Sequence, residues 1–190
     1  MRKNEKQIEK VADKEEMLLV LNEDGSETDT FEKRSIVHDK LLYHREVVLW
    51  VINKKERKIL FQRRAKDKRA WPDKFGLIAG HVVGNESLEE AVINEAKEEV
   101  GLNIKKLGYR HFFTFKKHEP NNYCYVYHYY TLANIPLDKY KIQEEELTEL
   151  RYVDYDEYKA AVHGRRHDFV FKWNELYDQM FYILDDIFDN

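Results

Sequence analysis

The sequence predicts an α+β fold, in which a mixed β-sheet carries helices packed against it. Several apolar segments bounded by turn residues have the length and pattern of strands. One central segment changes to helical periodicity, and two more helical segments lie near the C-terminus. Strands and helices do not alternate regularly along the chain, which favours an α+β fold or a sandwich over a doubly wound parallel sheet.

The expected strands begin with a hairpin. The apolar run Met17–Leu21 meets a strong turn signal at Asp24-Gly25, so the chain is expected to return over Thr28–Phe31. A charged turn at Lys54–Arg57 joins the next two strands. The remaining expected strands are 46–52, 58–63, 109–115, 123–132 and 151–153, with 76–83 as a strand or a tight loop.

The best-defined helix is expected over Glu86–Val100. Ser87 and Glu90 have the spacing of a capping box at its start, and Gly101 stands where a left-handed C-terminal cap is expected. The other expected segments are an acidic loop over 141–150 and helices over 156–162 and about 174–188.

The segment 123–132 carries a stripe of tyrosines. They stand at odd positions, and Cys124, Val126, His128 and Tyr130 stand between them. Because alternate residues of a strand point to opposite faces, one of the two sets must be buried. We expect the tyrosines to pack in the core or at an interface rather than to stack on a nucleobase.

A chain of 190 residues is long enough for one domain, which buries about two-thirds of its unfolded surface. Residues 1–15 are polar and charged and are expected to form an N-terminal arm. Residues 16–190 are expected to form a single domain, because no linker or internal repeat interrupts them.

Composition argues against several classes of protein. The single cysteine, Cys124, excludes an intramolecular disulfide framework and a multi-cysteine metal site. The net charge of -4 argues against a nucleic-acid partner, which usually meets a basic surface. No apolar run approaches the ~20 residues of a membrane helix, and no secretory signal is visible. We therefore expect a cytoplasmic protein with no membrane partner. The oligomeric state is left open, with a homodimer as one alternative.

Three glutamates are candidates for a metal site. Glu95, Glu98 and Glu99 stand at i, i+3 and i+4, which places them on one face of the expected helix. From Glu86 to Leu102 the chain has six acids and one base, so like charges repel with no local cation to offset them. Carboxylates in such a cluster suit a hard cation, Mg²⁺ or Mn²⁺. The alternative is a solvated acidic face.

The wider spacing around these glutamates resembles the Nudix box. Gly80 is followed after five residues by Glu86, and after seven more by the run Asn94-Glu95-Ala96-Lys97-Glu98-Glu99-Val100-Gly101-Leu102. Eight of the nine specified positions of the box match over residues 80–102. The resemblance covers residues 45–155 well. It implies a mixed-sheet α/β/α sandwich, extended here by C-terminal helices.

This resemblance also implies chemistry. It implies metal-dependent hydrolysis of a diphosphate bond in a nucleoside diphosphate-linked or related small-molecule metabolite, with Mg²⁺ or Mn²⁺ as the cofactor. Glu144 and Glu145 are alternatives for the general base. The implied metal ligands are Glu95, Glu98, Glu99 and His81, the implied catalytic residues are Glu98 and Glu146, and the implied substrate-binding residues are Arg63 and Arg64.

The mismatch in the box is Asn94, where the family has an arginine that orients a box glutamate. Asparagine donates a hydrogen bond but supplies neither a positive charge nor a bidentate fork. A non-catalytic Nudix-fold ligand-binding module is therefore one alternative to the hydrolase.

The flanking sequence resembles a narrower branch, isopentenyl-diphosphate isomerase and its Nudix relatives. His38, His44 and His81 match the positions of three metal-binding histidines of the isomerase. The alternative is that His44 and His81 are structural hydrogen-bonding residues. The isomerase also needs a cysteine where this chain has Ala79, and Cys124 lies in a later strand. Isomerisation is the first alternative function, ahead of the ligand-binding module, and the missing thiol disfavours it.

Overall fold

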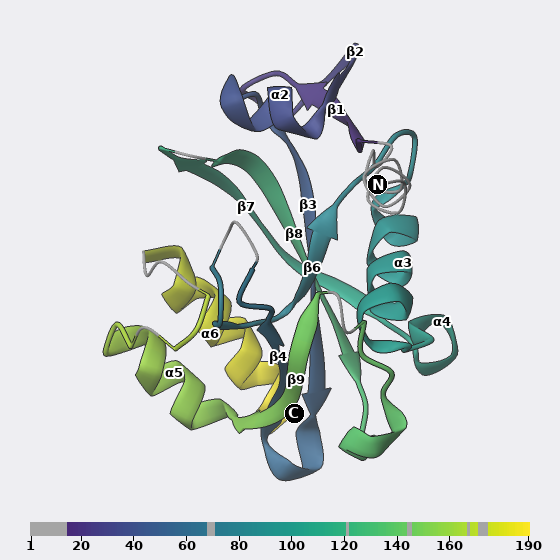
Figure 1. Ribbon diagram of the computed structural model, residues 1–190. Coiled ribbons are helices and arrows are strands. Elements are labelled where there is room, and N and C mark those ends of the chain that lie inside the picture. The colour runs from purple at the N-terminus through teal and green to yellow at the C-terminus, as the bar shows by residue number, and fades with distance from the viewer. Residues whose placement is uncertain (1–14, 68–70, 121, 144–145, 167, 171–174) are drawn as a thin grey trace, which may run out of the picture.

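The computed structural model describes residues 15–67, 71–120, 122–143, 146–166, 168–170 and 175–190 (Figure 1). Nearly all of the predicted arm, residues 1–15, lies outside them. No described helix is long and apolar enough to cross a membrane.

The main sheet has seven strands and is mixed. Its order is β5-β4-β3-β8-β7, with β6 also paired to β3 and β9 also paired to β4. β3 and β8 run parallel, and the other pairs are antiparallel. The strands are β3 (His44–Asn53), β4 (Lys58–Arg64), β5 (Phe75–Gly76), β6 (Ile78–His81), β7 (Arg110–Glu119), β8 (Asn122–Leu132) and β9 (Leu147–Asp154).

The sheet opens between β3 and β4. These two strands pair only at one end, where Ile52 faces Ile59 and Asn53 faces Lys58. Beyond that point β3 pairs with β6, while β4 pairs with β5 and β9. The opening brings the ends of several strands around one space, and the candidate site lies there.

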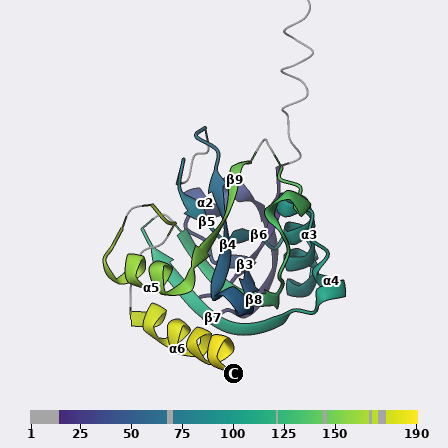
Figure 2. The same ribbon diagram turned by 90° about the horizontal axis from the view of Figure 1, so that it is seen from below.

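Helices cover both faces of the sheet, as Figure 2 shows. On one face, α3 and α4 enclose an apolar core that includes Val47, Leu49 and Val92. On the other face, α5 and α6 enclose a second core that includes Trp50 and Phe181. The helices are α3 (Leu88–Val100), α4 (Ile104–Leu107), α5 (Tyr155–His163) and α6 (Glu175–Asp189). The expected α/β/α arrangement with C-terminal helices is confirmed.

The expected N-terminal hairpin is also confirmed. β1 (Met17–Leu21) and β2 (Glu27–Lys33) form a separate two-stranded sheet, followed by the short helix α2 (Arg34–Asp39). Figure 1 shows these elements together at one end of the main sheet. Backbone hydrogen bonds fix them there, because Leu21 N donates to Tyr43 O over 2.8 Å.

Two boundaries correct the sequence-based expectations. β9 begins at Leu147, inside the segment expected to be an acidic loop over 141–150. It pairs with β4 from Leu147 to Asp154, so tertiary pairing overrides the weak strand propensity of its polar residues. Helix α3 begins at Leu88 rather than Glu86, because Ser87 is its N-cap.

Candidate active site

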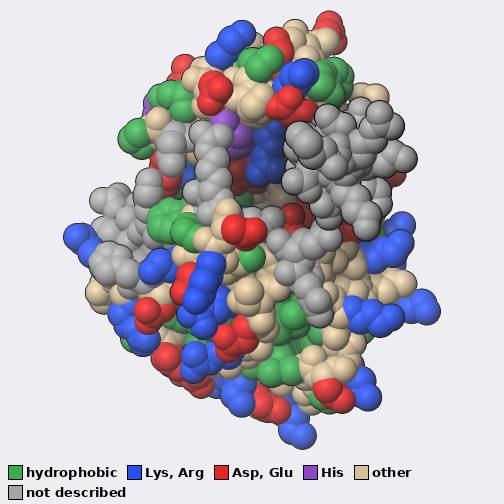
Figure 3. Space-filling model, in the orientation of Figure 1, with side chains coloured by type: hydrophobic (Ala, Val, Ile, Leu, Met, Phe, Trp, Pro, Cys, Tyr) green, Lys and Arg blue, Asp and Glu red, His purple; other side chains and the backbone are tan. Residues whose placement is uncertain are grey.

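A cavity of about 550 Å³ lies where β3 and β4 diverge. One side is lined by acidic side chains from α3 and by Glu146, which precedes β9. Arg34, Arg64 and Lys117 bring positive charge to the same cavity. Figure 3 shows histidine and basic side chains set back below the uppermost part of the molecule, with acidic side chains beside them. The cavity thus offers both anionic and cationic groups to a ligand.

Helix α3 is fixed at both ends. The Ser87 side chain accepts a hydrogen bond from Glu90 N, and the Glu90 carboxylate accepts from Ser87 N, so the predicted capping box is present. Gly101 ends the helix with a φ of 68°, as expected of a left-handed cap. The apolar side of the helix packs in the first core. The acidic side chains on its other side are therefore held by a well-anchored element.

Glu99 is the most deeply placed acid of α3, with 5% of its surface exposed. One carboxylate oxygen accepts hydrogen bonds from Gln62 Nε2 at 2.8 Å and Ala79 N at 3.3 Å. Burial raises the pKa of Glu99 to about 7, although these two hydrogen bonds act in the opposite direction. β4 and β6 therefore fix the orientation of this carboxylate.

Glu95 depends on the absence of a side chain at Gly80. A Cβ atom added at Gly80 would lie 1.8 Å from Glu95 Oε1, well inside contact distance. Burial, followed by the charges of Glu99 and Glu98, raises the pKa of Glu95 to about 8. Glu95, Glu98 and Glu99 thus all line the same cavity.

The donor set fits a divalent cation. Raised pKa values at Glu95 and Glu99 reflect the cost of burying charge beside like charge. A cation between the carboxylates would offset both costs, and oxygen donors are the ligands that Mg²⁺ and Mn²⁺ take. Glu98 is more exposed than Glu95 and Glu99 and also lines the cavity.

Asn94 acts outside this cluster. Its Nδ2 donates to Glu86 Oε1 at 2.8 Å, and the other oxygen of Glu86 accepts from Val83 N at 3.3 Å. The asparagine therefore holds the early glutamate of the box, at the entrance to α3. Among the residues that the structure describes, its side chain forms no hydrogen bond with Glu95, Glu98 or Glu99.

The two candidate arginines, Arg63 and Arg64, differ in their position relative to the cavity. Arg64 lines the cavity, whereas Arg63 is outside the lining among the described residues. Arg63 Nε lies 2.8 Å from Asp73 and its Nη1 lies 3.5 Å from Glu149. Neighbouring residues of a strand point to opposite faces, so only one of the pair reaches the site. Glu146, the candidate base, also lines the cavity, while Glu144 and Glu145 lie outside the described residues.

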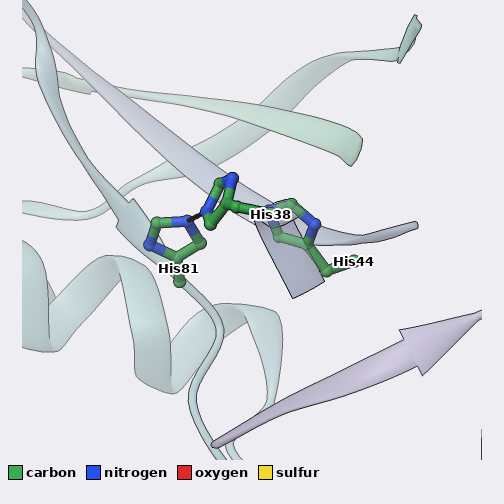
Figure 4. Close-up of side chains that lie close together, drawn as sticks. All are labelled: His38, His44 and His81. Atoms are coloured by element: carbon green, nitrogen blue, oxygen red, sulfur yellow. Dashed lines mark hydrogen bonds between the residues drawn. The ribbon is translucent and has the colours of Figure 1, made fainter. Parts of the chain in front are cut away.

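The three histidines form a compact group at the hairpin end of the cavity (Figure 4). One ring nitrogen from each of His38, His44 and His81 lies within 4.8 Å of the others. His38 Nε2 and His81 Nε2 are 3.1 Å apart. Glu46 Oε1 lies 3.6 Å from His44 Nε2 and 3.8 Å from His81 Nε2. Burial lowers the pKa of His81 to about 3, which keeps the ring neutral and able to bind a metal.

Sequence reasoning missed the part of the cavity that one face of the sheet supplies. Lys117, Trp50 and His128 line it, from β7, β3 and β8. The odd-numbered tyrosines of β8 lie on the opposite face, where Tyr127 and Tyr129 pack with the first core. The alternation of tyrosines with other residues along β8 indicates that the strand has two different faces. It does not indicate which of the two faces meets a cavity. Cys124 is buried and no cysteine lines the cavity among the described residues.

Comparison with known proteins places this geometry in a family. The NUDIX domain model matches residues 42–173. Nudix hydrolase 3 of Arabidopsis thaliana is 30% identical over 154 residues, which cover 76% of this chain and 20% of that relative. Isopentenyl-diphosphate Delta-isomerase of Escherichia coli is 37% identical over 90 residues, which cover 47% of this chain and 49% of the isomerase. The chain thus spans a fifth and about half of the lengths of these relatives.

A solved structure supports the fold independently. A crystal structure of a Deinococcus radiodurans protein superposes with a TM-score of 0.67 at 19% sequence identity. The match covers 78% of this chain and 90% of that one. At this identity the likeness concerns the arrangement of the strands and helices.

Proposed function

Because the chain belongs to the NUDIX domain family, we propose that it hydrolyses a diphosphate bond in a nucleoside diphosphate-linked or related small-molecule metabolite. The observation that carries the proposal is the cluster of Glu95, Glu98 and Glu99 on the wall of a cavity that also holds Arg64. Anionic groups that need a cation stand beside cationic groups that need an anion. A metal-bound diphosphate satisfies both.

The metal would be Mg²⁺ or Mn²⁺, held by Glu95, Glu98 and Glu99. When bound, it would screen the phosphate oxygens and activate the attacking water. Glu99 supplies an oriented carboxylate, since Gln62 and Ala79 hold one of its oxygens. Glu98, which is more exposed, faces the ligand.

The remaining steps fall to side chains of this chain. Arg64 and Lys117 bind phosphate oxygens, and their charges offset the negative charge that develops there. Glu98, a member of the cluster, or Glu146 accepts the proton of the attacking water, because both line the cavity. Arg63 has no part in this scheme, since Asp73 and Glu149 already neutralise it.

The histidine group is a candidate for a second metal. His38, His44 and His81 offer three nitrogen donors, and Glu46 offers a carboxylate. Such mixed donors suit a transition metal better than Mg²⁺. Asn122 Nδ2 donates to Glu46 Oε1 at 2.7 Å, which orients the carboxylate toward the group. His81 would then serve this second site rather than the glutamate cluster.

Three expectations accompany the proposal. The partner is a small-molecule diphosphate and not a nucleic acid. A cytoplasmic location is a further prediction from the sequence, and a homodimer is one alternative for the oligomeric state.

A substrate screen tests the proposed reaction. The panel is nucleoside di- and triphosphates, nucleotide sugars, dinucleotides and isoprenoid diphosphates, each with Mg²⁺ and with Mn²⁺. We expect release of a phosphate-containing product only with metal. Loss of Glu98 as ligand or base, in Glu98→Gln, should lower kcat by at least about 100-fold. Glu89→Gln is the matched control, because Glu89 is an exposed acid of the same helix outside the cavity lining.

Two outcomes would favour the alternatives. Interconversion of the isopentenyl-diphosphate isomers without phosphate release would identify an isomerase, against the argument from Ala79. Binding of panel compounds with no turnover under any metal would identify a ligand-binding module.

A further inference from the structure

The end of the cavity away from the glutamates carries a buried polar pair. Three strands stand side by side in register there, with His128 of β8 facing Val48 of β3 and Val48 facing Ala79 of β6. Neighbouring strands are ~4.8 Å apart, so His128 lies about 10 Å across the sheet from Ala79. Ala79 N contacts Glu99, and all three facing residues line the cavity. The histidine therefore lies two strand spacings from the residue whose backbone N–H holds Glu99.

Trp50 fixes the proton of His128. Trp50 Nε1 donates to His128 Nδ1 at 2.9 Å, and an indole nitrogen can only donate. His128 Nδ1 is therefore the bare nitrogen of the ring. Burial, with a smaller contribution from His111, lowers the pKa of His128 to about 3, so the ring is neutral near pH 7. The one proton of the neutral ring is on Nε2.

The Nε2–H group of His128 has no acceptor among the described residues and is buried. A buried hydrogen-bond donor without a partner lowers the stability of the fold, so the presence of His128 at this position needs an explanation. The ring lines the cavity and stacks on Phe115, with ring centroids 5.3 Å apart. Met180, whose side chain is flexible, lines the same cavity.

We propose that His128 is a specificity-determining residue, whose Nε2–H donates to a neutral acceptor on the group attached to the diphosphate. This inference rests on the proposed function for the position of the diphosphate. The donor is uncharged and lies among apolar rings, where a charged acceptor would be costly to bury, so it suits a carbonyl oxygen or a ring nitrogen. Trp50, Phe115 and Tyr158 line the same end of the cavity, and their apolar rings suit a flat ring such as a nucleobase. A hydrocarbon chain would leave the N–H unpaired.

Trp50 is a positioning residue in this account. It reaches the ligand only through His128, by holding the proton on Nε2. Without the indole N–H, the imidazole proton could move to Nδ1 and Nε2 would become an acceptor.

Binding of three probes tests the inference. ADP and UDP carry neutral acceptors, and geranyl diphosphate carries none beyond its phosphates. Dissociation constants are measured by calorimetry in Ca²⁺, with turnover measured separately in Mg²⁺. Trp50→Phe/His128→Phe removes both members of the pair, so neither is left unpaired. We expect this variant to bind at least one nucleoside diphosphate about tenfold more weakly, with geranyl diphosphate within about twofold of the wild type.

His128→Asn is the matched conservative variant. An asparagine amide can accept from Trp50 and also donate to a ligand, so it should recover part of the lost selectivity. Equal loss for all three probes in the double variant would show a merely structural role and overturn the inference. So would unchanged binding of all three in a well-folded variant.

Nitrogen NMR on ¹⁵N-histidine-labelled wild type gives a readout that needs no variant. We expect His128 Nε2 protonated and Nδ1 bare, and a change in the Nε2–H resonance with ADP or UDP but not with geranyl diphosphate. A proton on Nδ1, or the same response to all three probes, would overturn the inference. If the double variant turns over substrate with the selectivity of the wild type, the inference about His128 is wrong and the proposed hydrolase function is unaffected. If the wild type neither binds nor turns over any of the probes, both the inference and the proposed function are contradicted.

Discussion

Gly80 is the residue on which the position of Glu95 depends. The Gly80→Ala substitution would put a methyl group 1.8 Å from the present place of Glu95 Oε1, so the carboxylate must move. We expect metal affinity about tenfold lower, equivalent to about 1.4 kcal/mol, and a matching loss of kcat/KM. Gly84→Asn is the control, since nothing lies within 4 Å of a Cβ there and asparagine tolerates its positive φ. Wild-type affinity in a folded Gly80→Ala variant would contradict this reading.

The raised pKa values predict how the metal-free protein responds to pH. The pKa of Glu95 rises from 4.5 to about 8 on folding, so near neutral pH the folded state binds more protons than the unfolded chain. Stability therefore falls as pH rises toward 8. The buried histidines, with lowered pKa values, act oppositely but only below about pH 6.5, where unfolded histidine is charged.

We therefore expect the melting temperature in EDTA to fall between about pH 6.5 and 8, and the stabilisation by Mg²⁺ to grow over that interval. Thermal unfolding followed by circular dichroism measures both. Glu95→Gln should flatten the decline. A melting temperature that rises with pH in EDTA would contradict the prediction that Glu95 takes up a proton on folding. So would a Glu95→Gln profile identical to that of the wild type.

Asn94 does part of the work expected of the family arginine. Its bond to Glu86 fixes the turn before α3, and a hydrogen bond to a charged group contributes about 1.5–3 kcal/mol when well formed. Because both residues are half-buried, we expect Asn94→Ala to destabilise the fold by about 1–2 kcal/mol in urea unfolding. Asn103→Ala is the control, since the Asn103 side chain caps no helix. Equal stability of the two variants would show that the Glu86 bond contributes nothing.

At the scale of elements, α3 is the part that the sequence describes best. Its cap residues, its glutamate spacing and its apolar side are all local patterns, so they are visible without the rest of the chain. β9 is different, because its strand state comes from pairing with β4, which no local pattern encodes. The divergence of β3 and β4 likewise depends on competition among three partner strands.

Loss of the capping box is expected to lower the stability of the fold without changing the affinity for metal. Ser87→Ala removes the side-chain acceptor for Glu90 N, which should cost about 1 kcal/mol. The glutamates lie two or more turns away, so metal affinity should change less than twofold. Urea unfolding and calorimetry on the same preparation check both numbers. A large loss of metal affinity with unchanged stability would mean that the cap acts on the site directly.

At the scale of the whole molecule, the site joins residues that are far apart in the chain. The histidine group draws on α2, β3 and β6, and the cavity adds Lys117 and His128 from β7 and β8. A resemblance to a family motif identifies the glutamates and histidines one by one. The choice between Arg63 and Arg64, and between the two faces of β8, needs the sheet itself, because both members of each pair look alike in sequence.

Mn²⁺ binding followed by electron paramagnetic resonance, with turnover measured on the same samples, tests most directly whether α3 holds the cation used in hydrolysis. The variants are Glu98→Gln/Glu99→Gln and the control Glu89→Gln. We predict that the double variant loses one bound Mn²⁺ per chain and at least about 100-fold in kcat together, while the control keeps both. A folded double variant that binds Mn²⁺ and turns over substrate like the wild type would contradict the assignment of the metal to α3.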